Sequence, residues 1–156
     1  MTERTCGGCT ACCKTHMVLS IEKPPLTWCG SCVKGKGCGI YASRPEECAA
    51  FTCQWLMGFG ADIERPDKVR IVVDFSRNPV LDNVLVAQLW EVSSDALKSD
   101  FATRTIQQLM GGKLPILTIS CTANQSLFLP KGFPISQEAY DAYTKDGVQM
   151  KYYNAL

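Results

Sequence analysis

The stretch Cys6-Gly7-Gly8-Cys9-Thr10-Ala11-Cys12-Cys13 decides how the first third of this chain folds. Nine of the ten cysteines lie between Cys6 and Cys53, and the tenth is Cys121. An ordinary core has no need of thiols at this density. A metal site does, because its thiolates must converge on one ion from closely spaced backbone positions. The pattern therefore predicts a cysteine-ligated metal module.

The composition changes near Gly58-Phe59-Gly60 and predicts two regions. Residues 1–60 hold the cysteine-rich, metal-binding module, which is poor in large aliphatic side chains. Small modules without a sufficient apolar core need an additional cross-link, such as a bound metal ion, to fold stably. We therefore expect this module to be stabilised by metal. Residues 61–156 carry strand and helix patterns and form an α+β region whose role the sequence does not identify.

Charge and hydropathy restrict the partners and the cellular location that we expect for this protein. The net charge is +1 with basic residues spread along the chain, which disfavours nucleic acid as a partner. No apolar stretch reaches membrane-spanning length, and the segment before Cys6 has no signal-like apolar region. We therefore expect a cytoplasmic protein that is not bound to membranes. Its thiols would be reduced there, which argues against a disulfide framework.

The region after residue 60 reads as a ββαββα(β) succession. Strands are expected at 69–75, 84–92, 116–121 and 126–129, with a last one at 148–153. Helices are expected from Ser94 or Asp95 to Met110 and over 137–145, the second capped by Ser136. This order predicts a small antiparallel sheet with helices on one face.

A further helix is expected to begin at Ser43-Arg44-Pro45-Glu46, where Ser43 and Glu46 have the spacing of a capping box. It would run past Cys48 to Gly58 or Gly60. A regular helix could not aim Cys48 and Cys53 at the same ion. Either the two cysteines serve different metals, or the helix is distorted between them.

The cysteine spacing itself points to two metal sites. The steps from Cys6 to Cys9 and from Cys9 to Cys12 let a tight turn aim neighbouring sulfurs at one ion, and Gly7 and Gly8 suit such a turn. The side chains of the adjacent residues Cys12 and Cys13 point in different directions. They are therefore more readily ligands of two different metal sites than of one. A second set follows, at Cys29, Cys32, Cys38, Cys48 and Cys53.

These residues resemble the CxxCxxCC, or YkgJ-like, zinc- or iron-chelating family of bacteria. The resemblance covers about residues 6–55 and rests on Cys6-x-x-Cys9-x-x-Cys12-Cys13, Cys32, Cys38-Gly-Ile-Tyr41, Arg44-Pro45-x-x-Cys48, Phe51 and Cys53-x-Trp55. It implies eight metal ligands: Cys6, Cys9, Cys12, Cys13, Cys32, Cys38, Cys48 and Cys53. A related module in flagellin lysine-methylating enzymes implies an iron–sulfur cluster. Lys14, Val33 and Ala49 depart from the residues common in the family, and Cys29 is an addition.

Two further side chains are candidates for the site. Cys29 belongs to the second cysteine set, and His16, the only histidine, could replace a thiolate in a Cys₃His site. Eight thiolates suffice for about two zinc ions with four sulfurs each, which is the preferred interpretation. Iron–sulfur clusters also accept four cysteines and remain the alternative.

The predicted function is metal binding in a structural or adaptor role, with an unknown protein partner. An iron–sulfur redox or sensing protein and a metal-trafficking protein are the alternatives. Enzyme activity is not predicted, because a thiolate-saturated ion has no open position for water and no nucleophile pairs with His16. An accessory role to an enzyme stays open.

Overall fold

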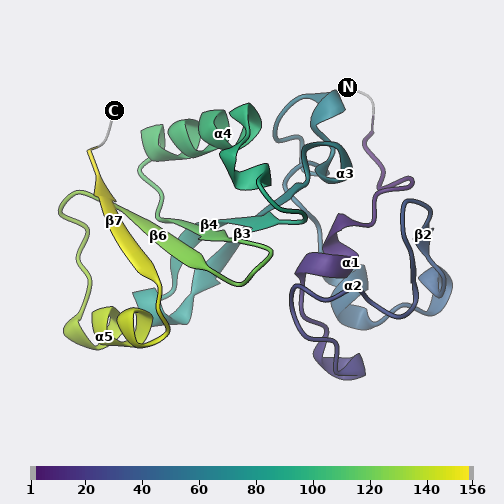
Figure 1. The fold of residues 1–156 in the computed structure, drawn as a ribbon, viewed down its shortest axis with the longest axis horizontal. Helices are drawn as coiled ribbons and strands as arrows, with labels where there is room; N and C mark the ends of the chain where they lie inside the picture. Colours follow the sequence, from purple (N-terminus) through teal and green to yellow (C-terminus); the bar gives the residue numbers. More distant parts are fainter. Residues whose placement is uncertain (1–2, 155–156) are drawn as a thin grey trace.

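The computed structural model describes residues 3–154 and places a cysteine-rich module beside a five-stranded sheet (Figure 1). Residues 1–2 and 155–156, the outer ends of the two expected regions, lie outside that range. The module is built from short elements joined by loops: α1 (Ala11–Thr15), η1 (Leu19–Ile21), β1 (Cys32–Val33), β2 (Gly37–Cys38), η2 (Tyr41–Ser43), α2 (Glu46–Ala50), η3 (Asp62–Glu64) and α3 (Pro66–Val69).

The second region follows the predicted succession of strands and helices. Its elements are β3 (Ile71–Asn78), η4 (Pro79–Leu81), β4 (Val84–Glu91), η5 (Ala96–Lys98), α4 (Asp100–Gly111), β5 (Ile116–Ile119), β6 (Gln125–Pro130), α5 (Gln137–Lys145) and β7 (Gln149–Tyr153). The predicted mixture of helices and strands is confirmed. The expected cap of α5 is present too, because the Ser136 hydroxyl accepts a hydrogen bond from the Ala139 amide.

The sheet is mixed, and the prediction of an antiparallel sheet was wrong. The strands lie in the order β3-β4-β5-β6-β7, with antiparallel pairs β3–β4 and β5–β6. The pairs β4–β5 and β6–β7 are parallel. The reason is that α4 and α5 each return the chain along the sheet before the next strand begins, which is what a parallel pair requires.

The two long helices cover opposite faces of this sheet, so the prediction of helices on one face was also wrong. Ala102 and Leu109 of α4 pack in a cluster with Ile116, whereas Tyr143 of α5 packs in another with Leu117. Successive residues of a strand point to opposite faces, so the sheet has a buried core on each side. Figure 1 shows α4 and α5 on the two sides of the strands.

The helix expected from Ser43 onward is much shorter than predicted. Ser43 belongs to η2, α2 spans only Glu46–Ala50, and its N-cap, Pro45, makes no side-chain capping bond. The chain is already extended at Phe51. The predicted helix to Gly58 or Gly60 was therefore wrong: the helix ends before Cys53, so Cys48 and Cys53 do not share one regular helix.

The cysteine module packs on β3, the edge strand of the sheet. Val72 is fully buried in one cluster with Ala11 and Cys53. The Gln54 amide donates a hydrogen bond to the Val73 carbonyl at 2.8 Å, so the module covers an edge that would otherwise be unpaired. Within residues 3–154, no helix is long and apolar enough to cross a membrane.

Candidate functional site

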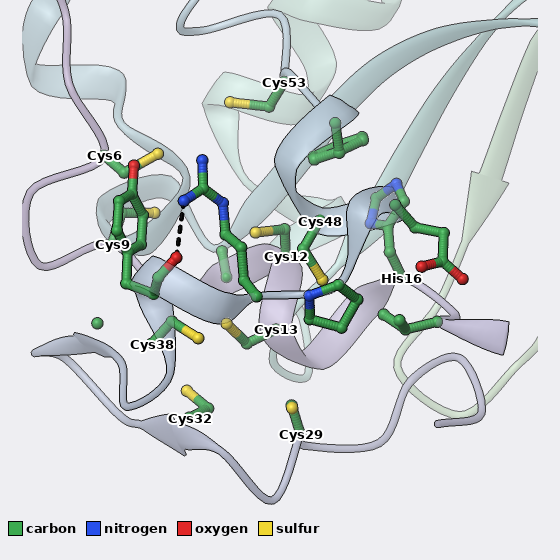
Figure 2. A pocket seen from close by; sticks show the side chains of 18 of the residues that line it. Cys6, Cys9, Cys12, Cys13, His16, Cys29, Cys32, Cys38, Cys48 and Cys53 are labelled. Atoms are coloured by element: carbon green, nitrogen blue, oxygen red, sulfur yellow. Dashed lines mark hydrogen bonds between the residues drawn. The ribbon is translucent and has the colours of Figure 1, made fainter. Parts of the chain in front are cut away.

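All nine cysteines of the first region line one cavity. Its volume is about 330 Å³, and His16 also lies on its wall (Figure 2). The thiols come from separate segments: Cys6 and Cys9 precede α1, Cys12 and Cys13 lie on α1, Cys29 is in a loop, Cys32 is on β1, Cys38 is on β2, Cys48 is on α2 and Cys53 follows α2. Cys121 lies apart, after β5, with its sulfur 3.6 Å from the Ser94 hydroxyl.

Backbone hydrogen bonds hold these segments together. The Cys9 amide donates to the Cys6 carbonyl at 2.8 Å, closing a turn in which Gly7 has a φ of +52°. The Cys29 amide donates to the Cys13 carbonyl at 3.0 Å, so the loop that carries Cys29 is bound directly to α1. The turn and the loop therefore position their thiols through main-chain contacts.

Gly8 allows the turn before α1 to approach the hairpin of β1 and β2. A Cβ atom at Gly8 would lie 2.7 Å from the Gly35 carbonyl oxygen, closer than real Cβ contacts allow. The Thr10 hydroxyl, two residues after Gly8, accepts a hydrogen bond from the Gly35 amide at 3.1 Å. The hairpin thus lies against α1 because the facing residue has no side chain.

One group of thiols is close enough for its members to perturb one another. The neighbouring Cys12 thiol, together with burial, raises the pKa of Cys13 far above its usual range. Burial and the nearby Cys13 raise the pKa of Cys32 to about 11. Burial, followed by the charges of Cys13, Cys29 and Cys38, raises the pKa of Cys48. We call this set, formed by Cys12, Cys13, Cys29, Cys32, Cys38 and Cys48, the inner thiol group.

The remaining three thiols lie toward β3 and α3. Burial is the main cause of the raised pKa of Cys53 and of Cys9. Cys6 adds a smaller upward effect at Cys53, while Arg65 and Asp67 act on Cys9. Arg65 and Asp67 are paired with each other at 2.6 Å. Cys9 therefore differs from the inner thiol group in having an arginine–carboxylate pair beside it.

Lys23 supplies a buried positive charge at the inner thiol group. Lys23 is only 6% exposed, and its ammonium group donates hydrogen bonds to the carbonyls of Lys14, His16 and Pro24. Burial lowers the pKa of this lysine, and the nearby cysteine charges oppose that effect. Such a cation favours thiolate over thiol in its neighbours. Sequence reasoning missed Lys23, since nothing in Glu22-Lys23-Pro24 suggests burial.

His16 is held at both ring nitrogens. Nε2 lies 2.7 Å from Oδ2 of Asp74 on β3, and Nδ1 lies 2.7 Å from the Thr15 hydroxyl. The ring also packs against Phe51 and Trp90 in tilted orientations. In this arrangement neither nitrogen is free, so metal ligation by His16 would require one of these bonds to break. Asp74 was not foreseen, because it occupies an apolar strand.

Asp74 keeps one oxygen without a partner. Its residue is 8% exposed, and among the residues described, its Oδ1 is a buried side-chain atom that makes no hydrogen bond. Buried carboxylates are normally satisfied, so the orientation of Asp74 depends on its single bond to His16.

The thiols line the cavity without converging on a point. Within residues 3–154, no three His, Cys, Asp or Glu side chains are grouped closely enough to hold a metal ion. The chemistry of the donors nevertheless fits a thiolate-bound metal, because several sulfurs line one cavity and the buried ammonium of Lys23 lies beside them. Coordination would require sulfurs of the inner thiol group to turn inward.

Comparison with known proteins identifies no relative. No protein-family model, no curated protein and no solved structure matches this chain.

Proposed function

We propose that this chain binds metal through the thiolates of its cysteine module, with about two zinc ions as the preferred content. The observation that carries the proposal is the shared cavity, whose wall is lined by nine cysteines from separate segments of the chain. A fold that needed these cysteines only as small apolar residues would bury them in its cores. Instead only Cys53 is buried, and the other eight are half-buried or exposed.

The ligands in this proposal are Cys6, Cys9, Cys12, Cys13, Cys32, Cys38, Cys48 and Cys53, with Cys29 as an additional donor. This is the ligand set that the resemblance to the CxxCxxCC family implies. Cys29 is a member of the inner thiol group, whose six sulfurs exceed the four of one zinc site. The bound metal would supply cross-links between loops that share little apolar core, and Lys23 would offset the negative charge of the thiolates.

An adaptor role is the function that this arrangement favours. An ion held by four thiolates has no open position, exchanges slowly and acts as a structural staple. In this proposal the module is held rigid on the edge of the sheet, and the molecule presents a fixed surface to a protein partner in the cytoplasm.

Two other functions remain as alternatives. A redox or sensing protein would hold an iron–sulfur cluster. Such a cluster also takes four cysteines, so the number of cysteines around the cavity suits a cluster as well as it suits zinc. A trafficking protein would hold exchangeable ions, which the exposed positions of Cys6 and Cys48 would favour.

The experiment that tests the adaptor role compares wild type with a Cys12→Ser, Cys13→Ser double variant. Both carry an affinity tag, and Cys121→Ser serves as the control because Cys121 lies outside the cavity. The proposal predicts a partner captured by wild type and by the control but lost with the double variant. It also predicts slow zinc transfer to a competing chelator. Transfer within seconds, with no captured partner, would favour trafficking instead.

The absorption spectrum of anaerobically purified protein separates the metals. Zinc–thiolate protein is colourless, whereas an iron–sulfur cluster gives broad visible absorption. A brown protein whose visible band bleaches reversibly on reduction would replace the adaptor role with the redox one.

A further inference from the structure

We propose that Cys32 and Cys38 are a modification site, at which a low-molecular-weight disulfide oxidises the pair to an intramolecular cross-strand disulfide. The starting observation is the register of the small hairpin. Cys32 of β1 lies directly opposite Cys38 of β2, and Val33 lies opposite Gly37. Directly opposed residues have side chains on the same face of the pair. Figure 2 shows both cysteines on the same side of the cavity.

The hydrogen bonds of the hairpin show whether Cys32 and Cys38 form a hydrogen-bonded or a non-hydrogen-bonded pair of the antiparallel ladder. The Gly39 amide donates to the Ser31 carbonyl at 2.7 Å, just outside the Cys32–Cys38 pair. In an antiparallel ladder, a bond between these flanking residues makes the enclosed pair a non-hydrogen-bonded one. Cα atoms of such pairs are about 4.5 Å apart, which lies within the roughly 4.4–6.8 Å that disulfides span. The bond can therefore form without a change of register.

Glycines hold this register in place. A Cβ atom at Gly39 would lie 2.9 Å from the Ser31 carbonyl oxygen, so the close approach of the strands depends on glycine. Gly35 and Gly37 have φ values of +73° and +138°, which the tight turn between the strands requires. The pairing of Cys32 with Cys38 is thus built into the hairpin, whereas other cysteines of the inner thiol group come from separate loops and helices.

The chemistry is thiol–disulfide exchange in two steps. The thiolate of one cysteine attacks a sulfur of the small disulfide, forming a mixed disulfide and releasing one small thiolate. The second cysteine, as thiolate, attacks the protein sulfur of that mixed disulfide and releases the other small thiolate. The two cysteines together lose two protons and two electrons, and the small disulfide is reduced to two thiols.

Oxidation withdraws two sulfurs from the wall of the cavity. If the cavity holds metal as proposed above, the bond removes two of the donors and links metal retention to the redox state. This consequence rests on the proposed function, but the disulfide itself does not, since it needs only the hairpin. The hairpin loop is short, so we expect the bond to change metal content far more than global stability.

Disulfide mapping of the full-length chain tests the proposal. The protein, with and without prior chelator treatment, is incubated with glutathione disulfide, its free thiols are alkylated, and it is digested with trypsin. Cleavage after Lys34 and Lys36 separates Cys32 from Cys38, so a bond between them joins two peptides. Fragment spectra then assign the linked sulfurs. We expect Cys32–Cys38 to be the dominant linkage in at least one sample and to lose its dominance when the chain is unfolded in guanidinium.

Variants make the test specific. Cys32→Ser and Cys38→Ser should each abolish the linkage, while Cys29→Ser should keep it. A dominant bond from Cys32 to any other cysteine, or no Cys32–Cys38 bond in either sample, would overturn the proposal. A chain that forms the bond but never binds metal would refute the proposed function alone. A chain that binds metal but never forms the bond would refute this inference alone.

Discussion

Nε2 of His16 lies 2.7 Å from Oδ2 of Asp74, and this pair links the cysteine module to β3. Both side chains are largely buried, at 20% and 12% exposed. Among residues 3–154, the second Asp74 oxygen has no hydrogen-bond partner, so the carboxylate would retain no hydrogen bond there if His16 were lost. The pair is therefore a contact on which the docking of the two regions depends.

His16→Ala should lower the free energy of unfolding by about 1–3 kcal/mol, since it leaves a buried carboxylate unpaired. Urea denaturation followed by circular dichroism measures this change. The matched control is Lys98→Ala, which breaks the exposed pair with Asp95 and should leave stability unchanged. Equal effects of the two substitutions would show that the His16–Asp74 pair has no special role.

Gly8→Ala should destabilise the protein by about 1–3 kcal/mol, because the new methyl group meets the Gly35 carbonyl oxygen and pushes the hairpin from α1. Gly30→Ala is the control: a Cβ there meets nothing within 4 Å. Thermal unfolding of the two variants provides the comparison. If Gly30→Ala proved as damaging as Gly8→Ala, close packing of the turn against the hairpin would not be the cause.

The Tyr143 phenol should make stability fall at alkaline pH. Burial raises the pKa of Tyr143, and the hydrogen bond from the Asn78 side chain, 2.8 Å long, partly offsets this. The unfolded chain therefore releases the proton first. The stabilising contribution is complete below the unfolded pKa of about 10 and is lost as the pH rises through the higher folded pKa.

Tyr143→Phe removes this titration. The variant should be about 1 kcal/mol less stable than wild type near neutral pH, where it lacks one hydrogen bond. That difference should shrink or reverse above about pH 10, because only wild type carries the titrating phenol. Urea denaturation of both proteins across this range decides the matter. Parallel stability curves would mean that Tyr143 ionises equally in the folded and unfolded chains.

Removal of metal should loosen the module before the sheet. On chelation we expect amide exchange to rise across the described residues up to 60 and at the β3 edge, where Gln54 donates to Val73. Amides of β4, β5 and β6 should keep their protection, because α4 and α5 cover them. Hydrogen exchange followed by mass spectrometry provides the comparison. Equal loss of protection in both regions would reveal one cooperative unit.

Local signals in the sequence predicted the elements of the second region well. Ser136 caps α5 as expected, and the strands expected at 69–75 and 84–92 are present as β3 and β4. The sheet topology was not predicted correctly, since the crossovers that pair β4 with β5 and β6 with β7 depend on how α4 and α5 pack. Packing of this kind is a tertiary property that no local spacing reveals.

The candidate site, like the fold, has features that the sequence predicts and features that it does not. Cysteine spacing predicted that these residues bind metal at two sites, which stays a prediction, and the structure places all nine on the wall of one cavity. The burial of Lys23 and the position of Asp74 could not be predicted, because each depends on a contact between segments far apart in sequence. The early end of α2 was missed because the capping pattern at Ser43 and Glu46 suggested a longer helix than tertiary contacts allow.

Elemental analysis combined with thiol titration of the purified protein tests the central claim most directly. The proposal predicts about two bound zinc ions per chain, with the module's thiols protected until a chelator or denaturant is added. Cys121, outside the cavity, should react early. Metal-free protein that is folded, with its cavity-lining thiols freely and rapidly titrated, would contradict the account.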